Sequence, residues 1–262
     1  MSAPAERRLE AESEIVAHIH TRARADGEVK TRDALDLARA LGGLLREPGH
    51  YAASVKPIED TTVTAAHCLN VAMLGMAAAE FLGFGEPERV AIGTAGLLHD
   101  IGYASPELAT DDQPAGADHT VAGARLLLRS GDRDRLATVV AYEHHIDWQG
   151  VCGYPQTHYP RQPHRFSRLI RICDSFDTLR TPRTHRPPLS EAAALELLER
   201  RAGLELDPDL VTGFAGLVRS HGSPRIPTDE GADEGELEGL AGAGEARYDA
   251  DSETEAAAAP DG

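Results

Sequence analysis

Histidine and aspartate residues recur at the ends of apolar segments in the middle of the chain. His99 and Asp100 close one such segment, and His144 and His145 close another. Asp174 lies inside the apolar stretch LIRICDSF, where an unpaired charge would be costly. Imidazole and carboxylate ligands together suit Zn, Fe, Mn or Ni, and such an ion can generate hydroxide near neutral pH. Each motif alone is weak evidence, but their occurrence together between apolar helices predicts a metal centre.

The segments that must position these residues have the hydrophobic spacing of helices. That spacing predicts helices over 33–46, 62–82, 86–99, 119–129, 133–144 and 165–180. Two more are expected after Ser190, which can cap a helix, and at Asp207-Pro208. Residues 147–164 contain two glycines and three prolines and are expected to form a loop. Because no segment alternates as a strand does, we predict an all-α helical bundle.

The composition limits the kind of protein this can be. A chain of 262 residues suggests one large domain with appendages, and a net charge of −17 argues against binding a nucleic acid polymer. No apolar run approaches the roughly 20 residues that span a bilayer, and the N-terminal residues lack the apolar core of a secretory signal. Three cysteines without paired spacing fit a reducing compartment. We therefore expect a cytoplasmic protein without membrane contact.

Both ends of the chain are expected to lie outside the central domain. From Ile226 onward there are twelve acidic residues and one arginine, a balance of −11, with few apolar residues. Such a segment cannot bury enough surface to fold, so residues 223–262 are predicted to be a disordered acidic tail. Residues 1–56 are predicted to be a helical lead-in that offers a homodimer contact, with His18 and His20 on its surface. No sensory module is visible, so any signalling protein partner is unidentified.

The ordered motifs resemble the HD-GYP family, a branch of the HD phosphohydrolase superfamily. The motifs are HCLNVAML with His67, LLHDIGY with His99 and Asp100, HTVAGARLL with His119, AYEHHIDWQGVCGYP with His144 and His145, and RICDSFDTLRTPRTHR with Asp174 and Asp177. The fourth motif ends in Gly153-Tyr154-Pro155, the triplet that gives the family part of its name. The similarity covers roughly residues 50–218, and the complete ordered set is highly specific. We therefore assign residues 57–222 to an HD-GYP domain with the HD-type helical bundle.

The resemblance implies a bacterial signalling enzyme that hydrolyses cyclic di-GMP. It implies two divalent metal ions, of Fe, Mn, Ni or Zn, with a bridging hydroxide that attacks phosphorus. One ion would be held by His67, His99, Asp100 and Asp174, and Asp100 would bridge to a second ion held by His119, His144 and His145. Asp100 and Tyr103 would act in catalysis. Substrate contacts would come from Tyr154, Arg183 and Arg186.

Arginines are concentrated in the segment that follows the loop. Residues 161–186 carry seven arginines against Asp174 and Asp177, a basic island in an acidic protein. Guanidinium groups suit phosphate oxygens through their forked donors. For Arg161 to Arg180, pairing with acidic neighbours on helix surfaces is the favoured interpretation. For Arg183 and Arg186, substrate contact is favoured.

Three positions depart from the family pattern. Tyr103 replaces a lysine thought to meet the phosphate or leaving group, so the cation is lost while a hydroxyl donor remains. One residue is inserted in the loop before the GYP triplet, where the usual aspartate falls nearest Gln149. Val63 replaces a carboxylate that helps to hold a third metal in some members, which favours two ions. These departures keep two alternatives open: a catalytically weakened signalling or binding module, and an HD phosphohydrolase acting on another nucleotide phosphate ester.

Overall fold

The protein is an all-helical bundle across the residues that the structure describes. This computed structural model describes residues 3–46, 64–108, 118–131, 135–156, 159–182 and 187–223. Within those ranges there is no strand, only two isolated β-bridges, so the predicted all-α fold is confirmed. The elements are α1 (Ala3–Asp26), α2 (Thr31–Leu44), α3 (Ala65–Phe81), α4 (Glu86–Leu98), η1 (Ile101–Ala104), η2 (Pro106–Leu108), α5 (Asp118–Arg129), α6 (Leu136–Glu143), α7 (Arg165–Arg180), α8 (Glu191–Arg201) and α9 (Pro208–His221).

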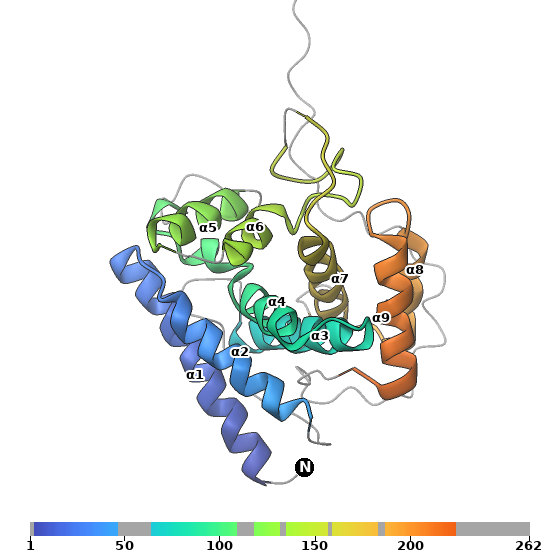
Figure 1. Ribbon diagram of the computed structural model, residues 1–262, viewed down its shortest axis with the longest axis horizontal. Coiled ribbons are helices and arrows are strands. Elements are labelled where there is room, and N and C mark those ends of the chain that lie inside the picture. The colour runs from blue at the N-terminus through green and yellow to red at the C-terminus, as the bar shows by residue number, and fades with distance from the viewer. Residues whose placement is uncertain are drawn as a thin grey trace, which may run out of the picture. The chain divides into compact units, whose positions relative to one another are not determined.

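Helix α3 lies at the centre of the bundle because it is apolar on every side. Its residues are almost all Ala, Leu, Met, Val and Gly, and most are buried. A helix that is hydrophobic all round belongs in a core rather than at a surface. It packs against α4 and α7 and also contacts α1, α2 and α9 (Figure 1). Of the helices that carry the histidine and aspartate motifs, α4 and α7 therefore pack directly on α3, while α6 packs on α4 and α7 and α5 packs on α6 and η1.

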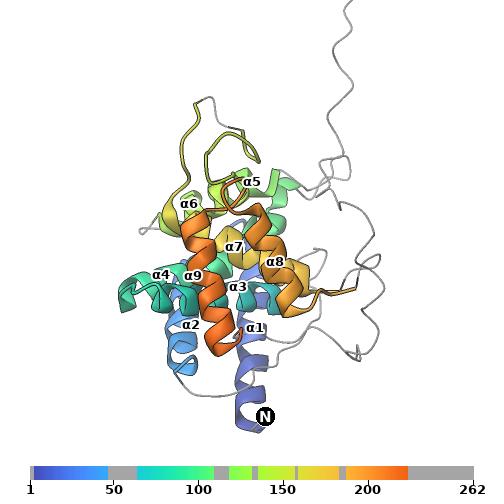
Figure 2. The same ribbon diagram turned by 90° about the vertical axis from the view of Figure 1, so that its right-hand side faces the viewer.

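Two hydrophobic clusters lie on opposite sides of α3. One joins α3 to α1, α2, η1 and α5, and the other joins α3 to α7, α8 and α9. Figure 2 shows α8 and α9 side by side in front of the central helices. The close crossing of α3 and α4 requires a glycine, since a Cβ at Gly96 would lie 2.8 Å from Ala72 Cα. This crossing fixes the end of α4, where His99 follows.

Helix α1 packs against α3 and η1, and one of its histidines was predicted wrongly. His20 is only 1% exposed, whereas we expected it at the surface; His18 is exposed as predicted. The His20 imidazole faces α3, with its Nε2 3.9 Å from Cys68 Sγ. Its position follows the buried face of α1 that Val16, Ile19 and Ala23 define.

Several predictions concern residues that the structure does not describe. Arg183, Arg186 and Val63 are among these residues, as is nearly all of the predicted acidic tail. The domain boundaries at 56 and 222 stay predictions. No helix in the described ranges is long and apolar enough to cross a membrane.

Candidate metal centre

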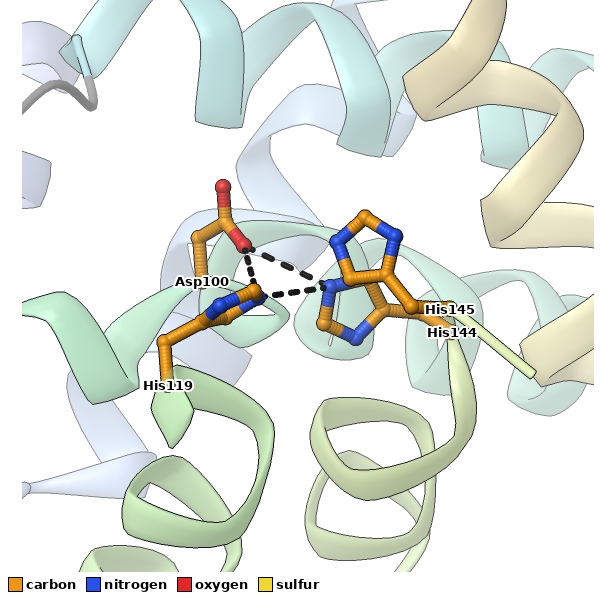
Figure 3. Close-up of side chains that lie close together, drawn as sticks. All are labelled: Asp100, His119, His144 and His145. Atoms are coloured by element: carbon orange, nitrogen blue, oxygen red, sulfur yellow. Dashed lines mark hydrogen bonds and ion pairs between the residues drawn. The ribbon is translucent and has the colours of Figure 1, made fainter. Parts of the chain in front are cut away.

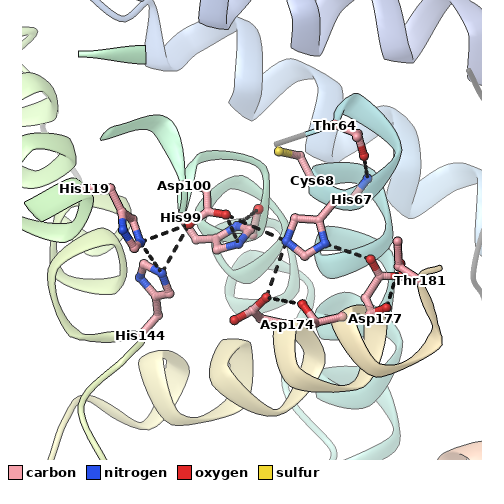
Figure 4. Close-up of polar contacts among 12 residues, drawn as sticks. Thr64, His67, Cys68, His99, Asp100, His119, His144, Asp174, Asp177 and Thr181 are labelled. Carbon is pink, nitrogen blue, oxygen red and sulfur yellow. Dashed lines mark hydrogen bonds and ion pairs between the residues drawn. The ribbon is translucent and has the colours of Figure 1, made fainter. Parts of the chain in front are cut away.

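Helix α3 places His67 in its first turn. Thr64 caps the helix, and its hydroxyl accepts a hydrogen bond from the His67 amide at 3.0 Å. Such a cap fixes where a helix begins. It therefore also fixes the direction in which the His67 side chain leaves the helix. Its Nε2 lies 3.4 Å from Asp174 Oδ1 and 3.8 Å from Asp100 Oδ2. Its Nδ1 lies 2.8 Å from Asp177 Oδ2 (Figure 4).

His99 and Asp100 lie where α4 ends, and Asp100 stands between two groups of histidines. His99 keeps helical backbone angles, while Asp100 at φ −99° and ψ 12° leaves the helix and starts η1. Asp100 Oδ2 lies 3.3 Å from His99 Nε2, on the side of His67. Asp100 Oδ1 lies 3.3 Å from His119 Nε2 on the opposite side. One carboxylate therefore faces both groups.

The second group comes from the start of α5 and the end of α6. His119 and His144 are completely buried, and their Nε2 atoms lie 3.3 Å apart. Asp100 Oδ1 lies 3.4 Å from His144 Nε2, which closes the triangle drawn in Figure 3. Donor atoms of Asp100, His119, His144 and His145 all lie within 4.8 Å of one another, and so do those of His67, His99 and Asp100. These two groups are the candidate metal sites.

The imidazole tautomers test whether cations fit these sites. His99 Nδ1 lies 2.8 Å from the Gly96 carbonyl oxygen, and His144 Nδ1 lies 3.0 Å from the Val140 carbonyl oxygen. A carbonyl only accepts, so each Nδ1 carries the hydrogen, and in the neutral ring each Nε2 presents a lone pair.

Those lone pairs face the oxygens of Asp100, which also accept. The separations of 3.3 and 3.4 Å are longer than the roughly 2.8 Å of a charge-assisted hydrogen bond. His99 Nε2 and Asp100 Oδ1 are moreover buried without a hydrogen-bond partner. Opposed acceptors at this spacing suit divalent ions between them, and the donor set of imidazole and carboxylate suits Zn, Fe, Mn or Ni.

The protonation states of the site agree with that fit. Burial would raise the pKa of Asp100, but His99, His119 and His144 hold that pKa well below its ordinary range. Burial lowers the pKa of His144 and lowers that of His145 well below 6.5. The carboxylate is therefore charged and the His144 and His145 imidazoles are neutral, which are the forms that bind a metal. At His99 burial would lower the pKa, but the neighbouring Asp100 carboxylate raises it.

The environment of His67 is more acidic. Burial would lower the pKa of His67, but hydrogen bonds to Asp174 and Asp177 raise it well above 6.5. Positive charge is therefore favoured at this end of the site. A divalent ion supplies such charge.

Two tyrosines flank the second group. Tyr103, on η1, stacks on His119 with ring centroids 4.3 Å apart and planes at 12°. Tyr154 stacks on His145 with centroids 4.5 Å apart and planes at 27°. Tyr103 therefore brings its ring to the site, at the position where the family has a lysine.

The loop that carries Tyr154 is anchored on both sides. A Cβ at Gly153, where φ is 87°, would lie 2.1 Å from the His145 carbonyl oxygen. The loop therefore approaches the His144–His145 pair so closely that only glycine fits at this position. Glu143, buried beside the doublet, pairs with Arg161 and accepts hydrogen bonds from the His164 amide and the Ser167 hydroxyl. This role of Glu143 was not predicted from the sequence, because its partners lie 18 to 24 residues away.

The arginines of α7 and of the loop have structural partners. Arg161 pairs with Glu143, and Arg168 pairs with Asp207 at the start of α9. Arg180 donates to the Leu189 carbonyl oxygen. Pairing with acidic neighbours was the favoured interpretation for Arg161 to Arg180; the contacts of Arg161 and Arg168 agree with it, whereas the described partner of Arg180 is a backbone carbonyl. The structure does not describe Arg183 and Arg186, whose substrate contacts stay a prediction.

All seven residues predicted to bind metal surround one centre. Asp174 reaches it through its contact with His67, and the Thr178 hydroxyl donates to Asp174 Oδ1 at 3.3 Å. Asp177 lies in the fifth motif, but no role was predicted for it from the sequence. Its spacing of three residues from Asp174 on one helix was the available signal.

Comparison with known proteins agrees with this site. Residues 64–179 match the family model described as HD domain, a range that contains all seven residues. This match agrees with the HD-type motifs of the sequence, and the His/Asp cluster has ligand atoms close enough together to hold metal ions.

The curated relatives are phosphodiesterases from bacteria. The chain is 29% identical over 163 residues to a cyclic di-GMP phosphodiesterase of Thermotoga maritima, which covers 58% of this chain and 44% of that protein. It is 28% identical over 206 residues to a cyclic di-GMP phosphodiesterase of Pseudomonas aeruginosa, covering 75% and 49%. It is 29% identical over 158 residues to a 3'3'-cGAMP-specific phosphodiesterase of Vibrio cholerae, covering 56% and 30%. The chain thus spans less than half the length of each of these relatives.

A solved structure shares the fold. The HDG"Y"P protein Bd1817 of Bdellovibrio bacteriovorus superposes with a TM-score of 0.58 at 13% identity, covering 80% of this chain and 69% of that one. At this identity the likeness concerns the fold alone. It confirms the helical bundle of the HD type.

Proposed function

We propose that this chain is a metal-dependent phosphodiesterase that hydrolyses cyclic di-GMP at a dinuclear metal centre. The observation that carries the proposal is the position of Asp100, whose two oxygens face two separate groups of imidazole acceptors. A single carboxylate in that position is suited to bridge two ions. The names of the Thermotoga maritima and Pseudomonas aeruginosa relatives support the cyclic dinucleotide as substrate.

Each group of residues has a defined task in this proposal. One ion would be held by His67, His99, Asp100 and Asp174, and the other by Asp100, His119, His144 and His145. Divalent ions at such a centre supply Lewis acidity toward phosphate oxygens and activate water as the nucleophile. Backbone carbonyl partners fix the tautomer and the direction of the buried His99 and His144 imidazoles. Little reorganisation of these side chains is therefore needed when a phosphodiester binds.

Tyr103 and Tyr154 form the wall of the second half of the site. Their rings stack on His119 and His145 and so limit how those imidazoles can rotate. A phenol hydroxyl can donate one hydrogen bond to a phosphate or leaving-group oxygen. In this chain Tyr103 would supply such a donor without the positive charge of a lysine.

The replacement of that lysine favours a second candidate substrate. The Vibrio cholerae relative is named for 3'3'-cGAMP, a different cyclic dinucleotide. A site in which a tyrosine replaces one positively charged side chain is expected to differ in rate or in substrate choice. Under the alternative of a weakened module, the site would bind a dinucleotide without cleaving it.

The test is hydrolysis by protein purified without oxygen, with metal content assayed on the same sample. Cyclic di-GMP, 3'3'-cGAMP and a simple nucleotide monophosphate are compared as substrates. Asp100→Ala is the control, because it removes the group shared by both half-sites. Cleavage of a cyclic dinucleotide that is lost in Asp100→Ala supports the proposal. Bound metal with cleavage of the monophosphate alone would assign another phosphate ester, and metal without any cleavage would assign a binding role.

A further inference from the structure

Two pairs of polar residues face each other across the contact between α3 and α7. His67 and Asn70 are three residues apart on α3, and Asp174 and Asp177 are three residues apart on α7. Side chains three apart lie on one face of a helix, and these two helices pack together. The pairing therefore follows from the helical spacing on both sides.

Both carboxylate oxygens of Asp177 are engaged in this contact. Oδ2 accepts from His67 Nδ1 at 2.8 Å, and Oδ1 accepts from Asn70 Nδ2 at 2.8 Å. Asp177 and Asn70 are completely buried. Figure 4 shows that His67 turns its other nitrogen toward Asp174 and Asp100. Asp177 thus fixes which nitrogen of His67 is available to a metal.

The other imidazoles with a described Nδ1 contact have weaker partners. His99 Nδ1 faces the Gly96 carbonyl oxygen, and His144 Nδ1 faces carbonyl oxygens of α6. A carboxylate partner raises the basicity of a ligating imidazole, and mutation of such partners typically weakens metal binding. Among the imidazoles with a described Nδ1 contact, only His67, in the first half of the centre, therefore has a carboxylate partner.

We propose that Asp177, held in place by Asn70, is a positioning residue that makes the half-site of His67, His99, Asp100 and Asp174 the tighter of the two metal sites. The half-site of His119, His144 and His145 then fills second. This inference rests on the proposed dinuclear centre. It goes beyond that centre by giving an order of metal loading and by assigning that order to two residues that bind no metal themselves.

The experiment titrates Co²⁺ into metal-free protein and follows binding by calorimetry and by the visible absorption of the bound ion. The wild-type chain should bind two ions in two resolved steps. Asp177→Asn keeps the size of the side chain but removes its charge. It should weaken the tighter step about 10- to 100-fold and change the absorption of the first bound ion. The weaker step should change by a smaller factor, because Asp177 contacts His67, a ligand of the first half-site.

A matched control removes a buried carboxylate charge elsewhere. Asp207 is 6% exposed, caps α9 and pairs with Arg168, away from the metal centre. Asp207→Asn should lower the stability of the fold while both Co²⁺ steps keep their wild-type affinities. A loss of metal affinity in Asp177→Asn alone therefore reflects its contact with His67 rather than a general effect of destabilisation.

A second variant protects the test against a folding defect. Asn70→Ala leaves Asp177 in place and should weaken the tighter step by a smaller factor. Combined with Asp177→Asn it should add nothing, because Asn70 acts through Asp177. Two resolved steps with wild-type affinities in folded Asp177→Asn, or in Asn70→Ala should the first variant not fold, would overturn the inference. Absence of Co²⁺ binding by the wild type would instead overturn the proposed metal centre.

Discussion

A methyl group added at Gly102 should separate the two halves of the metal centre. Gly102 lies on η1, two residues after Asp100, and faces the first turn of α5. A Cβ at this position would lie 1.8 Å from the His119 carbonyl oxygen and 2.7 Å from the Gly123 amide nitrogen. Both atoms belong to the backbone, so no side-chain rotation relieves the overlap.

The size of the displacement follows from these distances. Cβ contacts below 3.0 Å are essentially not found in proteins, so η1 and α5 must move apart by at least about 1.2 Å, the difference between 3.0 and 1.8 Å. Metal–ligand distances tolerate about 0.2 Å, and a misplacement of about 1 Å can reduce a rate about 100-fold. We expect Gly102→Ala to bind about one metal ion per chain instead of two, and to lose at least about 100-fold in phosphodiesterase rate.

The assay measures metal content, hydrolysis and urea unfolding on one preparation. Overpacking should lower the free energy of unfolding by about 1–3 kcal/mol. The matched control is Gly43→Ala on α2, where a Cβ meets nothing within 4 Å. This change should be neutral or add up to about 1 kcal/mol of stability, with metal content and rate unchanged. Two ions and a wild-type rate in Gly102→Ala would refute the bridging geometry assigned to Asp100 and His119.

Three further substitutions test other parts of the site. Tyr103→Phe keeps the ring on His119 but removes the hydroxyl, so kcat should fall roughly tenfold while metal content is unchanged. Burial lowers the pKa of His20 to about 4 from 6.5, so the unfolded chain takes up the proton first as the pH falls. The free energy of unfolding should therefore decrease by about 3 kcal/mol from above pH 6.5 to pH 4, and urea titrations of His20→Gln should lack this part of the decrease. Glu143→Ala removes the acceptor of the buried Ser167 hydroxyl and of the His164 amide, and calorimetry should show a loss of about 2 kcal/mol.

The helices could be predicted because their signals are local. Asp207-Pro208 marks the start of α9, and the apolar stretch from 165 to 180 coincides with α7 at Arg165–Arg180. The predicted helix at 133–144 begins later, at Leu136, and ends at Glu143. Local spacing and caps determine such elements with few long-range contributions.

The ligand residues could be predicted because several weak motifs occur in a fixed order. His67 on α3 lies within 4 Å of Asp100, which follows α4, and of Asp174 on α7. The family resemblance implied that these three residues come together. Their metal-binding role stays a prediction until an ion is observed.

The supporting residues could not be predicted from the sequence. His20 lies on a helix with many charged residues, and the spacing of Val16, Ile19 and Ala23, which places it on the buried face, was not used in predicting it at the surface. Asp177 and Glu143 take their roles from partners 107 to 110 and 18 to 24 residues away. Such contacts depend on how helices pack, which residue spacing within one helix does not specify.

Anomalous diffraction from crystals of the metal-loaded protein tests the central claim most directly. The account predicts two metal peaks per chain, one at about 2.0–2.2 Å from His67, His99 and Asp174 and the other at the same distance from His119, His144 and His145. Asp100 should contact both ions through its two oxygens. A single peak, or two peaks that do not share Asp100, would contradict the dinuclear centre.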